Sequence, residues 1–502
     1  MDKWTREEKD QILSEKDEKR LSVLHSSIAQ SKWRTQYHIQ TVTGLMNDPN
    51  GFTYFGGKWH LFYQWFPFGA VHGMKHWYHV SSEDLLHWHN EGLGLKPSLP
   101  FENDGCFSGS AYADDDILYL VYTGNSLNEE GKMVEYQMIG AMDEDGRIGK
   151  LPTPVIFPQS GYTCHQRDPH IFKEGDMYYI LLGAQDENLE GKLLIYESRQ
   201  IAYGWKFKGE LQVKGYPSFG YMCECPDIER IGDRWLLMFC PQGLHEKGDT
   251  TTNAYQSVYF TGKLDLAHLQ FIPDADMQLL DYGFDFYAPQ CANQNVYKNK
   301  PVMIGWYGCS DYSYPPTDEE GWANLQTLPR LLSYEDGRLK QRPVPVLNKL
   351  ALETVFEAKN GSIVNNRIFG RTPEACVIEL ENPSDSDVRL NLFTQRNERG
   401  FEIFYDSKEK KVVIDRSDLV NAVNTEYGTI RSVSLDKPLS QMQIFVDHST
   451  VEIFINDGDA VMTSRVFPNR EEHMIRMSGK DINLKISTAD TTVKDDFVLF
   501  RK

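Results

Sequence analysis

Three acids in this chain of 502 residues stand in rigid backbone settings, which suits side chains that carry out chemistry. Asp48, Asp168 and Glu224 each lie one or two residues before a proline. Proline fixes its own φ and pushes the residue before it into extended geometry, so these segments present carboxylates from a stiff backbone. A single acid of this kind commonly caps a turn. Three of them, each ahead of an apolar segment, suggest a shared purpose.

Two carboxylates flanking one bond are the requirement for glycoside hydrolysis. Retaining enzymes hold them about 5–5.5 Å apart and inverting enzymes about 6.5–9.5 Å apart. One carboxylate attacks in its ionised form, and the other keeps a proton for the leaving oxygen. By residue type, Asp48 suits the nucleophile and Glu224, with its longer reach, suits the acid/base. Asp168, next to Arg167, can stay ionised and hold sugar hydroxyls, although permutations of these roles stay open.

Five apolar and aromatic segments recur along the chain and would position these acids. They are 58–65, 117–124, 177–183, 234–240 and 302–308. Their first residues are 59, 60, 57 and 68 positions apart. Strand-rich repeats of this kind are typical of β-propeller blades, so the pattern predicts five blades. The three acids lie 10, 9 and 10 residues before their segments, and equivalent positions in a propeller share one ring. We therefore expect the acids to converge on the central channel.

The predicted fold is all-β, a five-bladed β-propeller followed by a C-terminal β-sandwich, with a short N-terminal helix. The length favours more than one domain. The expected divisions are a helical extension at 1–35, the catalytic propeller at 36–335, a linker at 336–353 and the sandwich at 354–502.

The two ends of the chain carry different signals. Residues 5 to about 30 resemble one helix that opens with a Thr5–Glu8 capping box, and we expect it to be a lid or brace. Short alternating strands and the turn signal Asn456–Gly458 predict the sandwich. Structural support is its expected role, and ancillary sugar binding or an oligomer contact is the alternative.

Composition and charge limit which partners and which cellular location the protein is expected to have. A formal net charge of −20 argues against nucleic acid, which requires basic patches. The charged N-terminus lacks an apolar signal region and no segment approaches the length of a membrane span, so a cytoplasmic protein is expected. The eight scattered cysteines predict reduced thiols. No cofactor and no metal are expected, and the expected assembly is a monomer or a homodimer.

Seven motifs follow one another in an order that is specific to one family. They are Asn-Asp-Pro-Asn-Gly at 47–51, Phe-Tyr-Gln at 62–64, Phe-Ser-Gly at 107–109, Arg-Asp-Pro at 167–169, Glu-Cys-Pro-Asp at 224–227, and the segments 321–330 and 446–458. This set resembles the signature of glycoside hydrolase family 32, the β-fructofuranosidases, over nearly the whole chain. The resemblance implies a five-bladed propeller with a sandwich, and retention of configuration at the fructosyl carbon.

The resemblance also implies roles for individual residues. Asp48 matches the nucleophile, Glu224 the acid/base and Asp168 the transition-state stabiliser. The residues implied in sugar binding are Leu45, Met46, Asn47, Gln64, Trp77, Phe107, Ser108, Arg167, Tyr287 and Trp306.

The segment around His72 bears on the substrate. Many family members carry Trp where this chain has His72, and the variant resembles the bacterial branch that acts on sucrose 6-phosphate. Lys75 would supply a point charge for a phosphate, and His72, His76 and His79 would supply donors. Two other readings are a metal site, which Gly73 disfavours, and histidines that are simply satisfied in the channel wall.

The expected activity is therefore hydrolysis of sucrose 6-phosphate to glucose 6-phosphate and fructose. The alternatives are an invertase or fructan hydrolase acting on unphosphorylated sugars, and a fructosyltransferase. A sugar-binding propeller without catalysis is a further alternative, but the presence of all three acids weighs against it.

Overall fold

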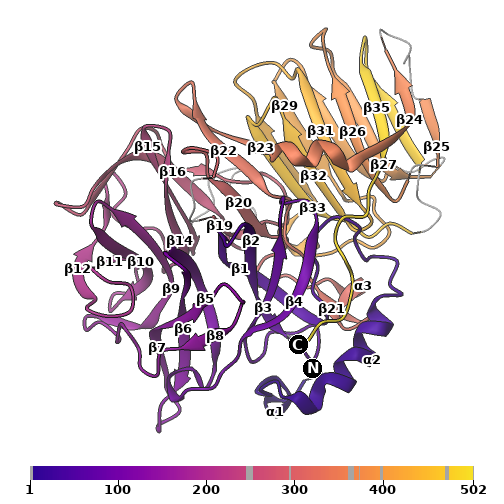
Figure 1. Ribbon diagram of the computed structural model, residues 1–502. Helices are drawn as coiled ribbons and strands as arrows, with labels where there is room; N and C mark the ends of the chain where they lie inside the picture. Colours follow the sequence, from indigo (N-terminus) through magenta and orange to yellow (C-terminus); the bar gives the residue numbers. More distant parts are fainter. Residues whose placement is uncertain are drawn as a thin grey trace.

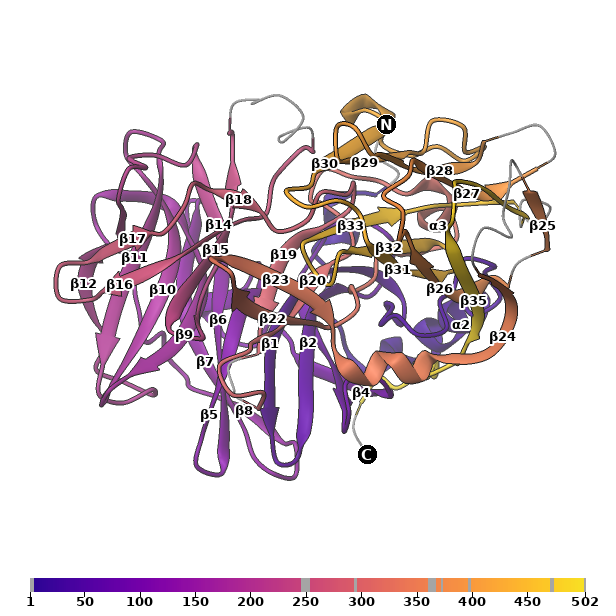
Figure 2. The same ribbon diagram turned by 90° about the horizontal axis from the view of Figure 1, so that it is seen from above.

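The computed structural model describes residues 4–244, 253–292, 296–359, 367–371, 373–395, 399–469 and 474–500. Each of the five apolar segments forms a strand in a separate antiparallel sheet. These strands are β2 (Lys58–Phe66), β6 (Ile117–Leu127), β10 (Met177–Asp186), β15 (Arg234–Gln242) and β20 (Val302–Trp306). The sheets are the five blades of a propeller, and the β-sandwich packs beside it (Figures 1 and 2). The predicted fold class is confirmed.

Each blade is built outward from one inner strand. Blade 1 holds β1 (Gly44–Phe55), β2, β3 (His76–Ser82) and β4 (Trp88–Leu95); blade 2 holds β5 (Gly105–Asp114), β6, β7 (Met133–Met142) and β8 (Ile148–Lys150). Blade 3 holds β9 (Tyr162–Glu174), β10, β11 (Gly191–Ser198) and β12 (Lys206–Glu210). Blade 4 holds β14 (Met222–Ile231), β15, β16 (Val258–Asp265) and β17 (Gln270–Pro273), with the short β13 (Gln212–Val213) and β18 (Gln278–Leu279). Blade 5 holds β19 (Tyr287–Cys291), β20, β22 (Arg330–Glu335) and β23 (Arg338–Pro343).

The inner strands β1, β5, β9, β14 and β19 contact one another around the central channel. The second strands are buried on both faces; in β2 every residue from Leu61 to Phe66 is buried. Blades stack face to face, so burial continues along consecutive residues of these strands instead of alternating. The ring closes where the short β21 (Trp322–Ala323), which follows blade 5 strand β20, pairs in parallel with β1.

The N-terminal segment differs from the single helix that was expected. It forms α1 (Arg6–Lys9), the 3-10 turn η1 (Glu15–Asp17) and α2 (Glu18–Ile28). The Thr5–Glu8 capping box is present and confirms the start. The helix stops because tertiary partners take the next backbone groups: the Lys9 carbonyl accepts the Met74 N–H, and the Leu13 N–H donates to His76 Nε2 at 3.0 Å.

The segment expected as a linker carries regular structure. It contains β23 of blade 5, followed by the 3-10 helix η4 (Pro345–Leu350) and then by β24 (Ala351–Ala358). Within the described ranges, three further short helices lie in loops: η2 (Pro100–Glu102), α3 (Pro315–Asp318) and η5 (Thr425–Tyr427). No helix among the described residues is long and apolar enough to cross a membrane.

Over the part of the chain that the structure describes, the sandwich consists of two six-stranded sheets. One has the order β24-β35-β26-β31-β32-β33, with β26 (Ala375–Glu381), β31 (Gln441–Asp447), β32 (Thr450–Ile455), β33 (Ala460–Arg465) and β35 (Asn483–Ala489). The other has the order β25-β34-β27-β28-β29-β30, with β25 (Arg367–Arg371), β27 (Val388–Thr394), β28 (Phe401–Asp406), β29 (Lys411–Asp415), β30 (Ile430–Ser434) and β34 (Met474–Ser478). Asn456 and Asp457 both have positive φ, 49° and 55°, as a tight hairpin turn requires.

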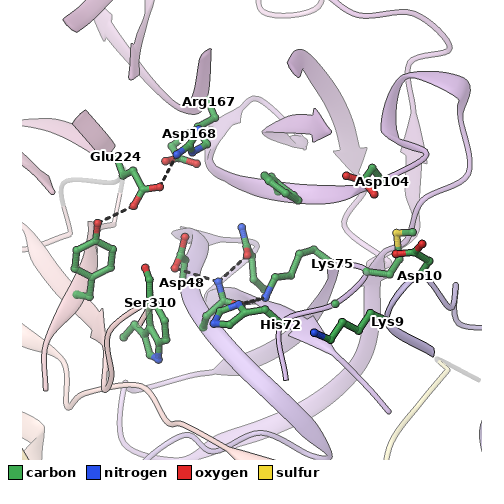
Figure 3. Close-up of a pocket in the computed structure, with 17 residues that line it drawn as sticks. Lys9, Asp10, Asp48, His72, Lys75, Asp104, Arg167, Asp168, Glu224 and Ser310 are labelled. Carbon is green, nitrogen blue, oxygen red and sulfur yellow. Dashed lines mark hydrogen bonds and ion pairs between the residues drawn. The ribbon is translucent and has the colours of Figure 1, made fainter. Parts of the chain in front are cut away.

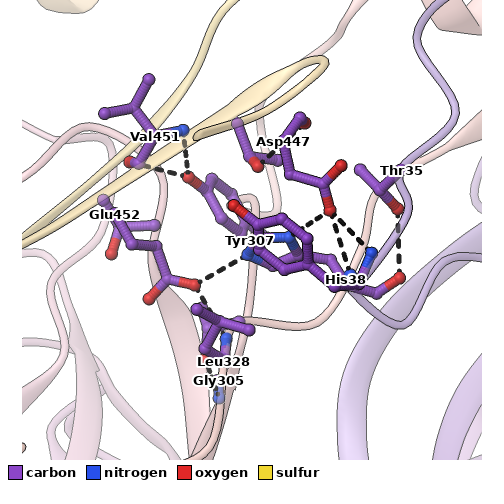
Figure 4. A network of polar contacts seen from close by, with 12 residues as sticks. Thr35, His38, Gly305, Tyr307, Leu328, Asp447, Val451 and Glu452 are labelled. Carbon is purple, nitrogen blue, oxygen red and sulfur yellow. Dashed lines mark hydrogen bonds and ion pairs between the residues drawn. The ribbon is translucent and has the colours of Figure 1, made fainter. Parts of the chain in front are cut away.

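A buried polar network joins the propeller to the sandwich (Figure 4). His38 Nδ1 lies 2.9 Å from Asp447 Oδ2, and His38 Nε2 lies 3.1 Å from Glu452 Oε1. Arg330 of blade 5 donates to the other oxygen of Glu452 at 3.1 Å. Burial opposes a charge on His38, but its bonds to Asp447 and Glu452 raise its pKa to about 9. The imidazolium therefore balances two buried sandwich carboxylates.

We expect His38→Leu to lower the free energy of unfolding by about 3 kcal/mol or more, because it leaves buried carboxylates without their cation. Since the folded pKa lies above the usual value of 6.5, this stabilisation is fully present below about pH 6.5 and is lost as pH rises through 9. Denaturant unfolding of both proteins at pH 6.5 and pH 9.5 measures the difference.

The control is His268→Leu, which removes an exposed partner of Asp265. It should change stability by less than about 0.5 kcal/mol at either pH. An equal loss of stability with pH in the wild type and in His38→Leu would contradict the charged state assigned to His38.

Candidate active site

The three acids lie together in one pocket of about 450 Å³ at the end of the central channel (Figure 3). Asp48 comes from β1, Asp168 from β9 and Glu224 from β14, which are inner strands of three different blades. Each acid lies at an irregularity in the pairing of its strand with the next one. Such bulges re-aim a side chain without ending the sheet, which explains how strand residues reach the pocket.

Asp48 is held between two donors. Ser108 donates to its Oδ2, and Asn47 Nδ2 donates to its Oδ1 at 3.1 Å. Burial raises the pKa of Asp48, while the hydrogen bond from Ser108 opposes that rise. Gln64 donates in turn to Ser108, so the carboxylate has a fixed orientation.

Asp168 has a left-handed backbone, with φ of 65°, which strains a non-glycine residue. Its Oδ2 accepts the Cys225 N–H at 2.9 Å, and the Cys225 sulfur lies 3.6 Å from both Asp168 Oδ2 and Asp48 Oδ2. Burial raises the pKa of Asp168 to about 8. The charge of Arg167 opposes this rise, and the charges of Glu224 and Asp48 add to it. The neighbouring Arg167 therefore does not keep this acid at an ordinary pKa, contrary to the sequence argument.

Glu224 accepts three hydrogen bonds, which fix its carboxylate at the pocket wall, and Figure 3 shows the one from Arg167. Arg167 Nη2 lies 2.6 Å from Oε1; Tyr287 Oη and Gln242 Nε2 lie 2.7 Å and 2.9 Å from Oε2. The Arg167 contact joins partly buried groups, and because its donor is charged it is the stronger, charge-assisted kind of hydrogen bond whether Glu224 is ionised or protonated.

The remaining residues expected to bind sugar divide into three groups. Eight line the pocket: Asn47, Gln64, His72, Lys75, Phe107, Arg167, Tyr287 and Trp306. Ser108 is not a lining residue, but its hydroxyl donates a hydrogen bond to Asp48, which is one. Leu45, Met46 and Trp77 are buried in core clusters and are not among the lining residues. Trp77 Nε1 donates to the Phe107 carbonyl, so it supports a residue that does line the pocket.

Of the three histidines expected near a phosphate, only His72 lines the pocket. His76 bonds the Met74 carbonyl and the Leu13 N–H, and His79 stacks on Phe62. Lys75 Nζ donates to Asn47 Oδ1 at 2.7 Å and lies 3.0 Å from His72 Nδ1. Burial lowers the pKa of Lys75 to about 7, and the charge of Lys75 holds the pKa of His72 well below its usual value.

Sequence reasoning missed several residues of the site. Those that line the pocket are Lys9, Asp10, Gly73, Met74, Asp104 and Ser310. Gln242 and Cys225 contact the acids directly. Cys225 stands inside a recognised motif and could have been singled out by that position, whereas Gln242 and the N-terminal residues carry no local signal.

One described group could hold a metal ion, and it lies outside the pocket. His170, Asp227 and Glu229 offer ligand atoms within 4.8 Å of one another. His170 Nε2 lies 3.7 Å from Asp227 Oδ1 and 3.5 Å from Glu229 Oε1. Burial opposes its charge, but Asp227 and Glu229 raise the pKa of His170. The group is therefore a buried cluster of one imidazole and two carboxylates, separate from the pocket of the three acids.

Asp48 and Asp168 both contact the Cys225 sulfur and share one pocket with Glu224, so two carboxylates can flank one bond there, as glycoside hydrolysis requires. The model "Glycosyl hydrolases family 32 N-terminal domain" matches residues 38–343, and "Glycosyl hydrolases family 32 C terminal" matches residues 350–495. The chain therefore belongs to glycosyl hydrolase family 32 and is a glycoside hydrolase, as its motifs predicted.

Within the family, the chain is similar to several proteins of known name or structure. The sucrose-6-phosphate hydrolase of Staphylococcus xylosus is 40% identical over 483 residues, covering 95% of this chain and 96% of that protein. The structure of sucrose-6-phosphate hydrolase from Lactobacillus gasseri is similar with a TM-score of 0.92 and 35% identity, covering 98% of this chain and 100% of that chain. The family 32 β-fructofuranosidase of Bombyx mori has a TM-score of 0.83 and 30% identity, covering 96% and 100%.

Proposed function

We propose that this enzyme hydrolyses sucrose 6-phosphate to glucose 6-phosphate and fructose with retention of configuration. The observation that carries the proposal is the meeting of Asp48, Asp168 and Glu224 in one pocket. Support for the phosphorylated substrate comes from the similarity to two sucrose-6-phosphate hydrolases that align over more than nine-tenths of the chain.

In the proposed mechanism Asp48 attacks the anomeric carbon of the fructosyl unit. Glu224 gives its proton to the glycosidic oxygen, so glucose 6-phosphate leaves and a covalent fructosyl-enzyme forms. Glu224 then takes a proton from water, which attacks the same carbon and releases Asp48. Asp168 holds the fructosyl hydroxyls, and Arg167 and Tyr287 keep Glu224 directed at the leaving oxygen.

The proposal includes three further points. The catalytic unit is the propeller, and the sandwich supports it through the network around His38. All eight cysteines are free thiols, which supports the cytoplasmic location expected from the sequence. The assembly is a monomer or a homodimer.

We expect kcat/KM for sucrose 6-phosphate to exceed that for sucrose by about tenfold or more, since a phosphate paired with a cation adds charge-assisted hydrogen bonds. Steady-state kinetics on the two substrates at pH 7 and constant ionic strength measure the ratio. Equal values would reject the phosphorylated substrate and favour an invertase. A dominant yield of fructosyl oligomers at high sucrose would favour transfer instead.

A further inference from the structure

The N-terminal segment builds part of the pocket wall. Lys9 and Asp10 line the pocket together with Asp104 of the loop before β5. In Figure 3 Lys9 and Asp10 lie on the side away from Asp168 and Glu224, and the Lys9 side chain extends toward His72. The fructosyl unit must lie among the three acids, so this opposite side is where the rest of the substrate would extend.

Close contacts hold the segment in place. The Met74 N–H donates to the Lys9 carbonyl at 2.7 Å. A Cβ on Gly73 would lie 2.8 Å from that carbonyl and 2.6 Å from the Phe66 ring, so glycine is required for this approach. Trp4 packs edge-on against Phe66, with ring centroids 5.9 Å apart. Lys9 therefore enters the pocket from a fixed backbone.

The basic groups on the propeller side are poorly suited to hold a phosphate alone. Lys75 already directs its ammonium at Asn47 and His72, close to the nucleophile. With a pKa of about 7 it carries only part of a charge at neutral pH, and the lowered pKa of His72 keeps that ring neutral. A phosphate monoester has about −1.5 to −2 charges at pH 7, so a further cation within reach would strengthen its binding.

We infer that Lys9 binds the phosphate of the glucosyl unit, so that the N-terminal segment determines the preference for a phosphorylated substrate. This inference rests on the proposed function. The neighbouring acids fit the same subsite. Asp10 is paired with Arg6 at 3.4 Å, and Asp104 accepts a hydrogen bond from Asn125 at 2.8 Å, so both can accept glucosyl hydroxyls beside the phosphate.

The test compares Lys9→Gln, Lys9→Arg and the control Lys16→Gln with the wild type. Lys16 is an exposed residue of the same segment and lies outside the pocket. We expect Lys9→Gln to lower kcat/KM for sucrose 6-phosphate by about tenfold or more, mostly through KM, and to change the value for sucrose less than about twofold. Lys9→Arg should retain most of the preference, and Lys16→Gln should behave as the wild type.

A second readout is product inhibition. Glucose 6-phosphate should inhibit the wild type more strongly than glucose, and Lys9→Gln should remove that difference. If the wild type prefers sucrose 6-phosphate and Lys9→Gln keeps the preference, the inference is overturned while the proposed function stands. Equal losses on both substrates would also overturn it, because they indicate a structural role. A wild type without any preference would reject both.

Discussion

Asp48→Asn is expected to lower kcat for sucrose 6-phosphate by about 10⁴-fold or more, because an amide cannot form the covalent fructosyl intermediate. The amide has nearly the same size as the carboxylate and can accept the hydrogen bond from Ser108. The fold should therefore be kept, and the thermal midpoint should change by only a few degrees. Single-turnover and steady-state kinetics measure the loss.

Asp48→Ala guards against deamidation of the asparagine, which would restore traces of the original acid. It should be as inactive as Asp48→Asn, although it leaves the Ser108 hydroxyl without its acceptor and costs some stability. Activity within tenfold of the wild type in either variant would remove Asp48 from the role of nucleophile.

Glu224→Gln is expected to lower kcat for sucrose 6-phosphate by about 10²–10⁴-fold, the usual contribution of general acid–base catalysis. A glutamine can still accept hydrogen bonds from Tyr287 and Gln242, but it has no proton to give to the glycosidic oxygen. Fructosides with good leaving groups need less protonation, so formation of the fructosyl-enzyme should be affected much less for them. Pre-steady-state release of the leaving group measures that step.

The matched control is Glu135→Gln. Glu135 is a buried acid that also pairs with Arg167, with Oε1 3.4 Å from Nη1, but it is not among the residues lining the pocket. Its loss should weaken activity by a factor that is the same for good and poor leaving groups. A Glu224→Gln defect that is equally independent of the leaving group would assign the acid role to another residue.

The local sequence predicted those features that depend only on residues close together in the chain. The apolar segments became strands β2, β6, β10, β15 and β20 because each contains at least five aromatic or apolar residues. The Thr5–Glu8 capping box formed because its partners are three residues apart. The motifs around Asp48, Asp168 and Glu224 named the acids, and the even spacing of the repeats predicted that they meet.

Other features depended on contacts between distant parts of the chain. The helix expected over residues 5–30 breaks because the Lys9 carbonyl accepts a hydrogen bond from Met74 in the loop before β3, and the Leu13 N–H donates to His76, the first residue of β3. Arg167 was expected to serve Asp168 beside it, but the strand turns it toward Glu224, 57 positions away. Trp77 has an aromatic surface suited to sugar, yet burial against blade 2 places it in the core.

The sequence by itself determined the number of blades, which three acids meet in one pocket, and the family. These properties follow from short-range patterns and from the repeat length, because each blade of four strands needs a similar length of chain. Only the tertiary structure decided which donors each acid has, which basic group faces the far side of the pocket and how the two units are joined. Those properties depend on distances between side chains up to 414 positions apart, as His38 and Glu452 are, and on the burial that sets their charges.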